Sequence, residues 1–352
     1  MNDLKNLFLN NIPLIDLRAP IEFTKGAFPN TTNIPLLTDD ERKLVGTCYK
    51  QQGQDKAIEL GHHLVQGETK SLRMQAWKNQ ILENPNAYLY CFRGGMRSHL
   101  VQQWLKDEGV NIPLIEGGYK ALRNYLLGVF EWPIDLIRIS GQTGVGKTDL
   151  LLQLENKIDL EGLANHRGSA FGEYVTNQPS QIDFESHFAV DILKLHDNNR
   201  PIIVEDEGRY IGSVNLPYAF IESMQKSPVL VLTCSQEERV QRIYQDYVVL
   251  QKSAFIEKDS NDGSEKFDTY LISALQKIQK RLGGKLFKQI KTTMQLALKQ
   301  ESAEHHKKWI THLLKEYYDP MYDYQLEKKS EKVIFKGDKN QIQEFINDNY
   351  YK

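Results

Sequence analysis

The sequence predicts an α/β protein made of two modules, each with a parallel β-sheet, and a helical extension towards the C-terminal end. Its 352 residues exceed the size at which a single hydrophobic core usually stops growing. Short apolar runs alternate with helical patterns in two stretches, one on each side of Phe130–Pro133. The second stretch opens with a glycine-rich loop between an expected strand and an expected helix. We therefore expect one domain at 1–128 and a second at 134–352.

The first module is expected to alternate strands and helices as a parallel sheet requires. Gly53, Gly61 and Gly67 are expected to break a polar, helical stretch into shorter helices. The expected elements are a buried strand at 12–18, helices over 40–80, a strand at Ala87–Tyr90 and an amphipathic helix at Ser98–Glu108.

The second module is expected to repeat this alternation and then to become mostly helical and charged from about Glu237. The polar segment Lys258–Lys266 has a composition typical of a disordered loop. The expected elements are a strand at Ile134–Ser140, a helix opening at Asp149–Leu154, and apolar strands at Pro201–Val204 and Pro228–Thr233.

The loop GQTGVGKT, which follows the first of these strands, matches the phosphate-binding pattern GxxxxGK[ST] throughout. Gly141, Gly144 and Gly146 allow the loop to curl, so that backbone N–H groups face phosphate oxygens at the positive end of a helix dipole. Lys147 is expected to neutralise the terminal phosphate, and Thr148 to ligate Mg²⁺. The pattern indicates a diphosphate site without distinguishing a nucleotide from another diphosphate ester.

Three further segments are candidates to complete this anion site. The strand at Pro201–Val204 ends in acids, and Glu205 or Asp206 is expected to hold the Mg²⁺, the alternative being an acidic turn. Arg167, in the small-residue segment HRGSAFG, is a candidate phosphate contact. Arg239 is another, although the helix that carries it could equally present a solvated face.

Cys91 lies in a second loop, CFRGGMRS, again between a strand and a helix. Glycine N–H groups, a helix N-terminus and the arginines Arg93 and Arg97 would all favour a thiolate, which is the nucleophilic form. The same groups would stabilise an anionic persulfide or the oxyanions of a donor molecule. The alternative is a buried packing cysteine. Of the other cysteines, Cys234 is expected in the core, and Cys48 is ambiguous, with an accessory thiol as one interpretation.

Composition limits the class of protein further. Three cysteines form neither a disulfide framework nor a zinc-ligand pattern, and no apolar run approaches the roughly 18 residues that a membrane span needs. We expect a cytoplasmic location without a membrane partner. Although the net charge is only −2, residues 269–300 contain seven basic residues and no acid. This basic stripe comprises Lys277, Lys280, Arg281, Lys285, Lys288, Lys291 and Lys299.

Several motifs together resemble a known family. LIDLRAPIEF at 14–23 and the segments at 26–29 and 33–35 resemble the opening of a rhodanese domain, and CFRGGMR resembles its active-site loop. Joined to a P-loop domain with HRGSAFG, EDEGRYIG and YYDPMY, the combination is similar to the tRNA 2-selenouridine synthase family over nearly the whole chain. The fold that this implies is a rhodanese-like domain followed by a P-loop NTPase-like domain.

The resemblance implies selenium-for-sulfur exchange at the wobble 2-thiouridine of tRNA, and no DNA partner. Geranyl diphosphate, held by the P-loop with Mg²⁺, would first alkylate the 2-thio sulfur, and selenium from selenophosphate would then replace it. Cys91, with Arg93 and Arg97, would either accept selenium as a perselenide or orient selenophosphate. The basic stripe would bind tRNA phosphates. A tyrosine near the C-terminal end would stack on an anticodon base, the alternative being that these tyrosines pack in the core. The candidates are Tyr317, Tyr318, Tyr322 and Tyr324.

Two other functions remain open at this point. The P-loop alone is equally typical of an ATP- or GTP-dependent kinase or switch, with the first module as a regulatory domain. A non-catalytic persulfide carrier would account for the cysteine loop but would leave the second module without a purpose.

Overall fold

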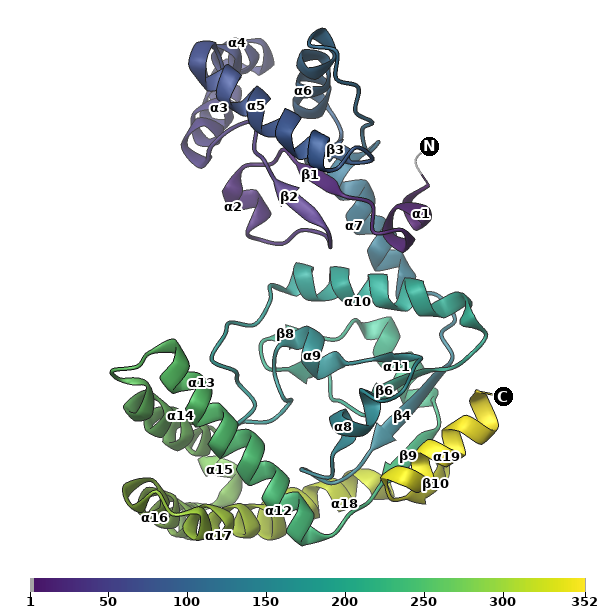
Figure 1. Cartoon of the computed structure of the whole chain (residues 1–352), viewed down its shortest axis with the longest axis vertical. Coiled ribbons are helices and arrows are strands. Elements are labelled where there is room, and N and C mark those ends of the chain that lie inside the picture. Colours follow the sequence, from purple (N-terminus) through teal and green to yellow (C-terminus); the bar gives the residue numbers. More distant parts are fainter. Residues whose placement is uncertain (1–2, 352) are drawn as a thin grey trace. The chain divides into compact units, whose positions relative to one another are not determined.

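The computed structural model describes residues 3–351 and confirms the α/β class, with helices around parallel sheets in two compact units (Figure 1). Unit 1 extends to Trp132 and also includes Ser180–Lys194. Unit 2 comprises Pro133–Pro179 and the chain from Leu195 onward.

Unit 1 contains a three-stranded parallel sheet in the order β2-β1-β3. Its strands are β1 (Leu14–Asp16), β2 (Thr31–Asn33) and β3 (Tyr88–Tyr90), with Ile15 opposite both Thr32 and Leu89. All three residues of β1 are buried, as expected for a central strand of a parallel sheet. The expected strands at 12–18 and Ala87–Tyr90 are therefore confirmed, whereas β2 lies between the expected elements and was not predicted.

The helices of unit 1 surround this sheet and its apolar core. Gly53 (φ 88°) separates α3 from α4, but Gly61 lies inside α4, so the break expected there is wrong. A Cβ at Gly61 would lie 4.0 Å from Val45 Cγ2, an ordinary contact within the packed α3–α4 pair. The helices are α1 (Leu4–Leu9), α2 (Pro20–Phe23), α3 (Asp39–Gln52), α4 (Gln54–Leu64), α5 (Gly67–Glu83), α6 (Met96–Asp107), α7 (Gly118–Val129) and α10 (Gln181–Leu195).

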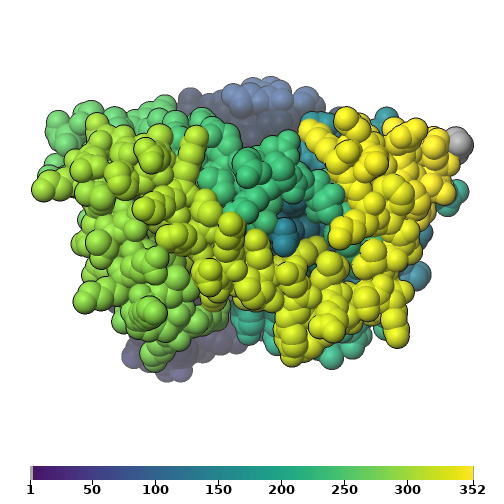
Figure 2. All heavy atoms as spheres, turned by 90° about the horizontal axis from the view of Figure 1, so that it is seen from below, coloured from purple at the N-terminus to yellow at the C-terminus, as the bar shows by residue number. Residues whose placement is uncertain are grey.

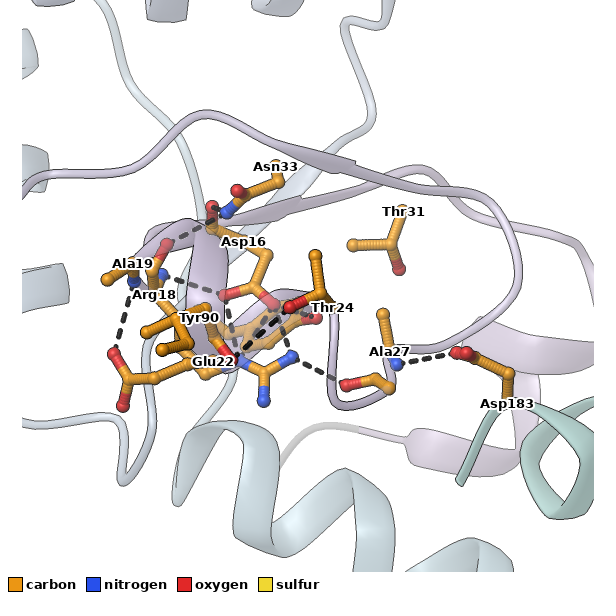
Figure 3. Close-up of polar contacts among 12 residues, drawn as sticks. Asp16, Arg18, Ala19, Glu22, Thr24, Ala27, Thr31, Asn33, Tyr90 and Asp183 are labelled. Atoms are coloured by element: carbon orange, nitrogen blue, oxygen red, sulfur yellow. Dashed lines mark hydrogen bonds and ion pairs between the residues drawn. The ribbon is translucent and has the colours of Figure 1, made fainter. Parts of the chain in front are cut away.

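Helix α10 packs in unit 1, although it falls within the span expected for the second module. The backbone N–H of Ala27 donates to Asp183 Oδ1 at 2.8 Å (Figure 3). Gly26 has no room for a side chain, because a Cβ there would overlap Ile182. These partners lie more than 150 positions apart in the chain, so no local pattern could assign α10 to the first module.

Unit 2 contains a five-stranded parallel sheet in the order β10-β9-β4-β6-β5. The central strand β4, which precedes the P-loop, is buried throughout and pairs on one side with β6 and on the other with β9. Because parallel strands end at the same edge, the P-loop lies beside the acids that follow β6. The strands are β4 (Leu136–Ser140), β5 (Lys157–Ile158), β6 (Ile202–Glu205), β9 (Val229–Leu232) and β10 (Val333–Gly337).

The remainder of unit 2 is mainly helical, as expected. The segment Lys258–Lys266 is ordered, because the Asp259 side chain accepts from the N–H groups of Asn261 and Asp262, so the expected disordered loop is wrong. The helices are α8 (Lys147–Leu151), α9 (Leu160–Ala164), α11 (Tyr218–Lys226), α12 (Gln236–Tyr244), α13 (Leu250–Lys258), α14 (Gly263–Lys277), α15 (Gln279–Leu282), α16 (Gly284–Gln300), α17 (Ala303–Leu313), α18 (Asp319–Glu327) and α19 (Lys339–Tyr350).

The C-terminal part of unit 2 returns to the sheet. After α18 the chain forms β10, which pairs with β9, and α19 then packs on the sheet. Figure 2 shows a face of unit 2 that is formed largely by the later part of the chain, with helical segments in green and the C-terminal segments in yellow. A short antiparallel hairpin, β7 (Tyr210–Ile211) with β8 (Val214–Asn215), follows the acids after β6. None of the helices between residues 3 and 351 has the length and apolar character that crossing a membrane would need.

Candidate active sites

The P-loop of unit 2 has the backbone that its glycines predict. Gly144 (φ 79°) and Gly146 (φ 93°) adopt the left-handed conformation that glycine tolerates, and Gly146 caps α8. At Gly141 a Cβ would lie 2.7 Å from Val145 Cγ1 and 2.8 Å from Leu232 O, so only glycine fits. The N–H groups of the first turn of α8 therefore lie free of helical partners, beside the side chain of Lys147.

Thr148 and Glu205 form the part of this site that fits Mg²⁺. Thr148 Oγ1 donates to Glu205 Oε1 at 2.6 Å and lies 3.5 Å from Glu161 Oε2. Glu205 is fully buried, and its Oε2 has no hydrogen-bond partner. A hydroxyl and an unsatisfied carboxylate are ligands that Mg²⁺ prefers, with phosphate oxygens and water completing its shell. Among residues 3–351 no group of three or more His, Cys, Asp or Glu forms a metal cage without such additions.

A carboxylate cluster, defined here as the buried Glu205 with the half-buried Glu161 and Glu207, lies near Lys147 and Thr148. Burial, aided by neighbouring carboxylates, raises the pKa of Glu161 to about 9 and that of Glu205 to about 7. Burial also raises the pKa of Glu207, with the ammonium of Lys147 acting in the opposite direction. The cluster is thus short of positive charge, which a bound cation would supply.

Asp206, the other metal candidate, has a different environment. Its carboxylate pairs with Arg138 at 2.9 Å and with Lys329 at 2.7 Å, and it accepts from Ser140 Oγ at 2.8 Å. Although burial alone would raise the pKa of Asp206, Lys329 and Arg138 hold it below its usual value. The structure therefore brings Glu205 to Thr148 and turns Asp206 to a structural ion pair, because adjacent strand residues point to opposite faces.

Arg239 and Arg242 of α12 form hydrogen bonds with the P-loop. Arg239 is 3% exposed, so a solvated face is wrong for this residue. Its Nε donates to Thr143 O at 2.9 Å and its Nη1 to Gln142 Oε1 at 2.7 Å. Arg242 Nη1 donates to Gly144 O at 2.6 Å. Both guanidinium groups bind carbonyl groups of the loop, so they fix its shape.

Arg167 and Gly168 approach the carboxylate cluster from the HRGSAFG segment. Gly168 has a φ of 62°, and a Cβ added to it would lie 2.7 Å from Glu161 Oε1 and 2.8 Å from Glu207 Oε2. The Arg167 guanidinium lies 4.5 Å from the ring centroid of Tyr174, and its Nη1 is buried without a hydrogen-bond partner. A buried guanidinium N–H without a partner fits an anionic ligand.

Glu161 and Glu207 are the site residues that the sequence did not single out. Glu207 belongs to the acidic run after β6 and could have been included with Glu205 and Asp206. Glu161 lies in the short helix α9, more than 40 residues before these acids, and no local pattern marks it.

The cysteine loop of unit 1 joins β3 to α6. Cys91 is 3% exposed, and its Sγ lies 3.3 Å from Ser98 Oγ and 3.9 Å from Gly95 O. The loop is attached to the start of α7, because Tyr119 N donates to Cys91 O at 2.8 Å. Gly118 lacks space for a side chain, since a Cβ would overlap Cys91 O. The expected thiolate stays a prediction.

The two arginines of this loop differ. Arg97 Nη1 pairs with Glu22 Oε2 at 2.9 Å, and Arg42 Nε binds the same oxygen at 3.1 Å. Arg93 is exposed. Of the two predicted charges, the structure therefore engages Arg97 with a carboxylate and leaves Arg93 accessible to an anion near the loop.

A buried polar network supports β3, from which Cys91 follows (Figure 3). Arg18 Nε donates to Asp16 Oδ2 at 2.8 Å, and Tyr90 Oη donates to the same oxygen at 2.7 Å. The Arg18 guanidinium also lies 4.0 Å from the ring centroid of Tyr119. These contacts join β1, β3 and α7. They therefore fix β3, which precedes the cysteine loop, relative to α7, to which the loop is hydrogen-bonded.

The basic stripe lies along α14, α15 and α16, and most of its side chains are exposed. Lys277 pairs with Glu173 at 2.9 Å. Of the four tyrosines considered for base stacking, Tyr318 is buried in the helical core and Tyr324 is 59% exposed. Lys328 lies 4.2 Å from the Tyr324 ring centroid. The packing alternative therefore holds for Tyr318, and Tyr324 is the one most accessible to a ligand.

Comparisons with known proteins agree with these motifs. The family model described as "tRNA 2-selenouridine synthase AAA domain" matches residues 134–352. A tRNA 2-selenouridine synthase of Marinobacter nauticus is 49% identical over 98% of this chain and 96% of its own length. Enzymes of the same name from Shewanella oneidensis and Pseudomonas syringae pv. syringae are each 47% identical, over 97% and 98% of this chain and 93% and 97% of their own lengths.

Proposed function

The chain belongs to the tRNA 2-selenouridine synthase family, and we propose that it replaces the 2-thio sulfur of a wobble uridine in tRNA by selenium through an S-geranyl intermediate. The observation that carries the proposal is the contact of Thr148 with the buried, half-satisfied Glu205 at a complete phosphate-binding loop. That corner suits a Mg²⁺-bound diphosphate, which geranyl diphosphate provides as its leaving group.

Alkylation is proposed to take place at unit 2. The 2-thio sulfur attacks C1 of the geranyl group, the C–O bond breaks, diphosphate leaves, and the base loses its N3 proton. Lys147 and the first N–H groups of α8 stabilise the negative charge that grows on the diphosphate. Arg167, whose Nη1 has no partner, would bind a further oxygen. Mg²⁺, held by Thr148 and Glu205, would supply additional positive charge to the diphosphate when bound.

Selenium insertion is proposed to take place at the cysteine loop of unit 1. Selenophosphate selenium bonds to C2 of the base, the C2–S bond breaks, and geranylthiol leaves with a proton. Water then cleaves the Se–P bond and releases phosphate. The N-terminus of α6 and the exposed Arg93 would orient the phosphate group, with Cys91 at the base of the loop.

This chemistry favours orientation of selenophosphate over a perselenide on Cys91. When phosphate is released, selenium leaves selenophosphate at the oxidation level of selenide. A perselenide requires oxidation of that selenium by two electrons, and the reaction as written contains no oxidant. The proposal therefore assigns Cys91 and its loop to positioning the donor at C2.

Purified protein, geranyl diphosphate and tRNA containing 2-thiouridine test the first step, with nucleosides measured by mass spectrometry. We expect the intact chain to form S-geranyl-2-thiouridine. Lys147→Ala should slow this alkylation at least about 100-fold, because the loss of one group that stabilises negative charge in the transition state has an effect of that size in comparable sites. Lys226→Ala, at an exposed lysine of α11, is the matched control. Undiminished alkylation by Lys147→Ala would remove the P-loop from the reaction. Nucleotide hydrolysis without alkylation would favour the kinase or switch.

A further inference from the structure

A large cleft of unit 2 adjoins the P-loop site and is not used by the chemistry described above. Its volume is about 1060 Å³. Segments from three parts of the chain line it: the residues around Arg167 and up to Gln178, the β7–β8 hairpin, and the end of α13 with one side of α14. Four aromatic side chains, Tyr174, Tyr210, Phe255 and Tyr270, stand in its wall. We call this the aromatic cleft.

The aromatic cleft reaches the carboxylate cluster through Gly168. Gly168 lines the cleft, and a Cβ on it would lie within 2.8 Å of oxygens of Glu161 and Glu207. Tyr174 also lines the cleft and packs against Arg167, whose buried Nη1 is without a partner. Gly168 and Tyr174 thus connect the cleft with the carboxylate cluster and with Arg167, respectively.

Hydrogen bonds hold the wall of the cleft in place, and the Arg209 guanidinium lies 5.5 Å from the ring centroid of Tyr210. Gln178 Oε1 accepts from Ser213 N at 2.7 Å, and its Nε2 donates to Ala164 O at 2.8 Å, which fixes the β7–β8 hairpin. Tyr210 on this hairpin remains 62% exposed. On the opposite side Phe255 and Tyr270 pack with ring centroids 5.4 Å apart.

The charge of the lining is weakly positive and continues into the basic stripe. Three lysines, Lys258, Lys266 and Lys277, line the cleft together with the two acids Glu173 and Asp259. Lys277 is also the first residue of the basic stripe, which continues along α15 and α16. A strand of phosphates lying on the stripe would therefore arrive at the mouth of the cleft.

We propose that the aromatic cleft receives an unpaired nucleotide of the RNA substrate, with its base on the exposed ring of Tyr210 and the neighbouring phosphates on the basic stripe. This inference rests on the proposed function and adds to it the place where the base to be alkylated enters. Aromatic platforms bordered by lysines are how proteins hold single-stranded nucleic acid. A prenyl chain fits the cleft less well, because polar side chains, among them Thr176, Asn177 and Ser213, also line it.

Three variants and three ligands test the proposal. The variants are Tyr210→Ala, Tyr210→Phe, which keeps the ring, and Tyr218→Ala, which removes an equally exposed tyrosine (68%) of the same unit outside the cleft. The ligands are an RNA stem–loop, the fully paired duplex of its stem, and geranyl diphosphate with Mg²⁺. The dissociation constant of each pair is measured in the full-length protein.

We expect Tyr210→Ala to raise the Kd for the stem–loop about tenfold, which is what the loss of one stacked base costs. Binding of the duplex and of geranyl diphosphate should be unchanged, and the latter also shows that the P-loop site is intact. Tyr210→Phe and Tyr218→Ala should bind the stem–loop like the unsubstituted chain.

Other results would overturn the assignment in distinguishable ways. An unchanged stem–loop Kd in Tyr210→Ala, with RNA still bound, would remove the nucleotide from the cleft and leave the proposed function standing. A raised Kd for geranyl diphosphate alone would assign the cleft to the prenyl chain. If the unsubstituted chain bound no RNA, the inference and the proposed function would fall together.

Discussion

Glu205 and Asp206 are neighbours in the chain with opposite surroundings. Glu205 is buried against Thr148 with one oxygen unsatisfied, whereas Asp206 is held by Arg138 and Lys329. The first carboxylate lacks a cation and the second already has two. Their substitution should therefore have different consequences, one for metal binding and the other for folding.

Glu205→Gln should change how the stability of the metal-free protein depends on pH. The pKa of Glu205 is raised from 4.5 to about 7 in the folded chain, so the unfolded chain ionises first and stability falls as pH rises between these values. Ionisation of Glu205 should lower the free energy of unfolding of the unsubstituted chain by about 2–3 kcal/mol between pH 4.5 and pH 8, and Glu205→Gln should not show this decrease. Urea unfolding in a chelator at several pH values measures this.

The same experiment with Mg²⁺ and inorganic diphosphate separates ionisation from binding. We expect the added ligands to raise the urea midpoint of the unsubstituted chain above pH 7 and to raise that of Glu205→Gln much less. A variant whose pH profile and ligand response both match the unsubstituted chain would show that Glu205 is not the metal carboxylate.

Asp206→Asn should destabilise unit 2 instead. It leaves the buried guanidinium of Arg138 without its counter-charge, and breaking such a pair costs about 3–5 kcal/mol. Because the pKa of Asp206 is held below 3.8, its contribution is present at neutral pH and is lost as pH falls through that lowered pKa. Urea unfolding at pH 7 measures the loss. Wild-type stability combined with lost Mg²⁺ binding would contradict this role.

At the scale of elements, the start of α7 determines the shape of the cysteine loop. Gly118 has φ 57° and lies where a Cβ would overlap Cys91 O, whereas a Cβ on Gly128 of the same helix would meet no atom within 4 Å. Glycine is therefore required at position 118 but not at position 128. One is required by the contact with the loop, and the other is a tolerated weak point of a helix.

Gly118→Ala should displace the cysteine loop, costing at least about 1–2 kcal/mol from the left-handed conformation alone. Selenium insertion should fall while geranyl diphosphate binding by unit 2 stays unchanged. Gly128→Ala is the matched control and should keep both activities, with a stability gain of up to about 1 kcal/mol. Nucleoside mass spectrometry and thermal unfolding give the two readouts. If both variants behaved alike, the Cys91–Gly118 contact would have no functional importance.

Local patterns in the sequence were sufficient for several elements and insufficient for others. The strand leading to the P-loop and the strand leading to Cys91 were predicted because each is an apolar run ending in a glycine-rich loop. The strands β2, β5 and β10 were not predicted, because none of them is an apolar run that leads into a glycine-rich loop, and each becomes recognisable only through its pairing with another strand.

The candidate site shows the same limit. The P-loop residues, Glu205 and Arg167 were found from motifs, and the structure brings Glu205 to Thr148 of the P-loop. Glu161 was missed because it lies in α9 without any local signal. Arg239 was found, but its place beneath the loop carbonyls depends on the packing of α12, which sequence spacing does not reveal.

For the whole molecule, the path of the chain matters as much as the two sheets. The chain crosses between the units after Trp132, again after Pro179 and again after Lys194. A fragment beginning at Pro133 would therefore retain α10 without Phe130, against which its buried Phe188 packs. Experiments on either reaction step thus belong in the full-length protein.

The central claim is that alkylation belongs to the P-loop and selenium insertion to the cysteine loop of one chain. Sequential reaction tests it most directly: tRNA with 2-thiouridine is treated with Cys91→Ala and geranyl diphosphate, repurified, and then given to Lys147→Ala with selenophosphate. Mass spectrometry should show S-geranyl-2-thiouridine after the first protein and 2-selenouridine after the second, although neither variant alone yields selenouridine from 2-thiouridine. Full conversion by either single variant, or none by the sequence of both, would contradict the account.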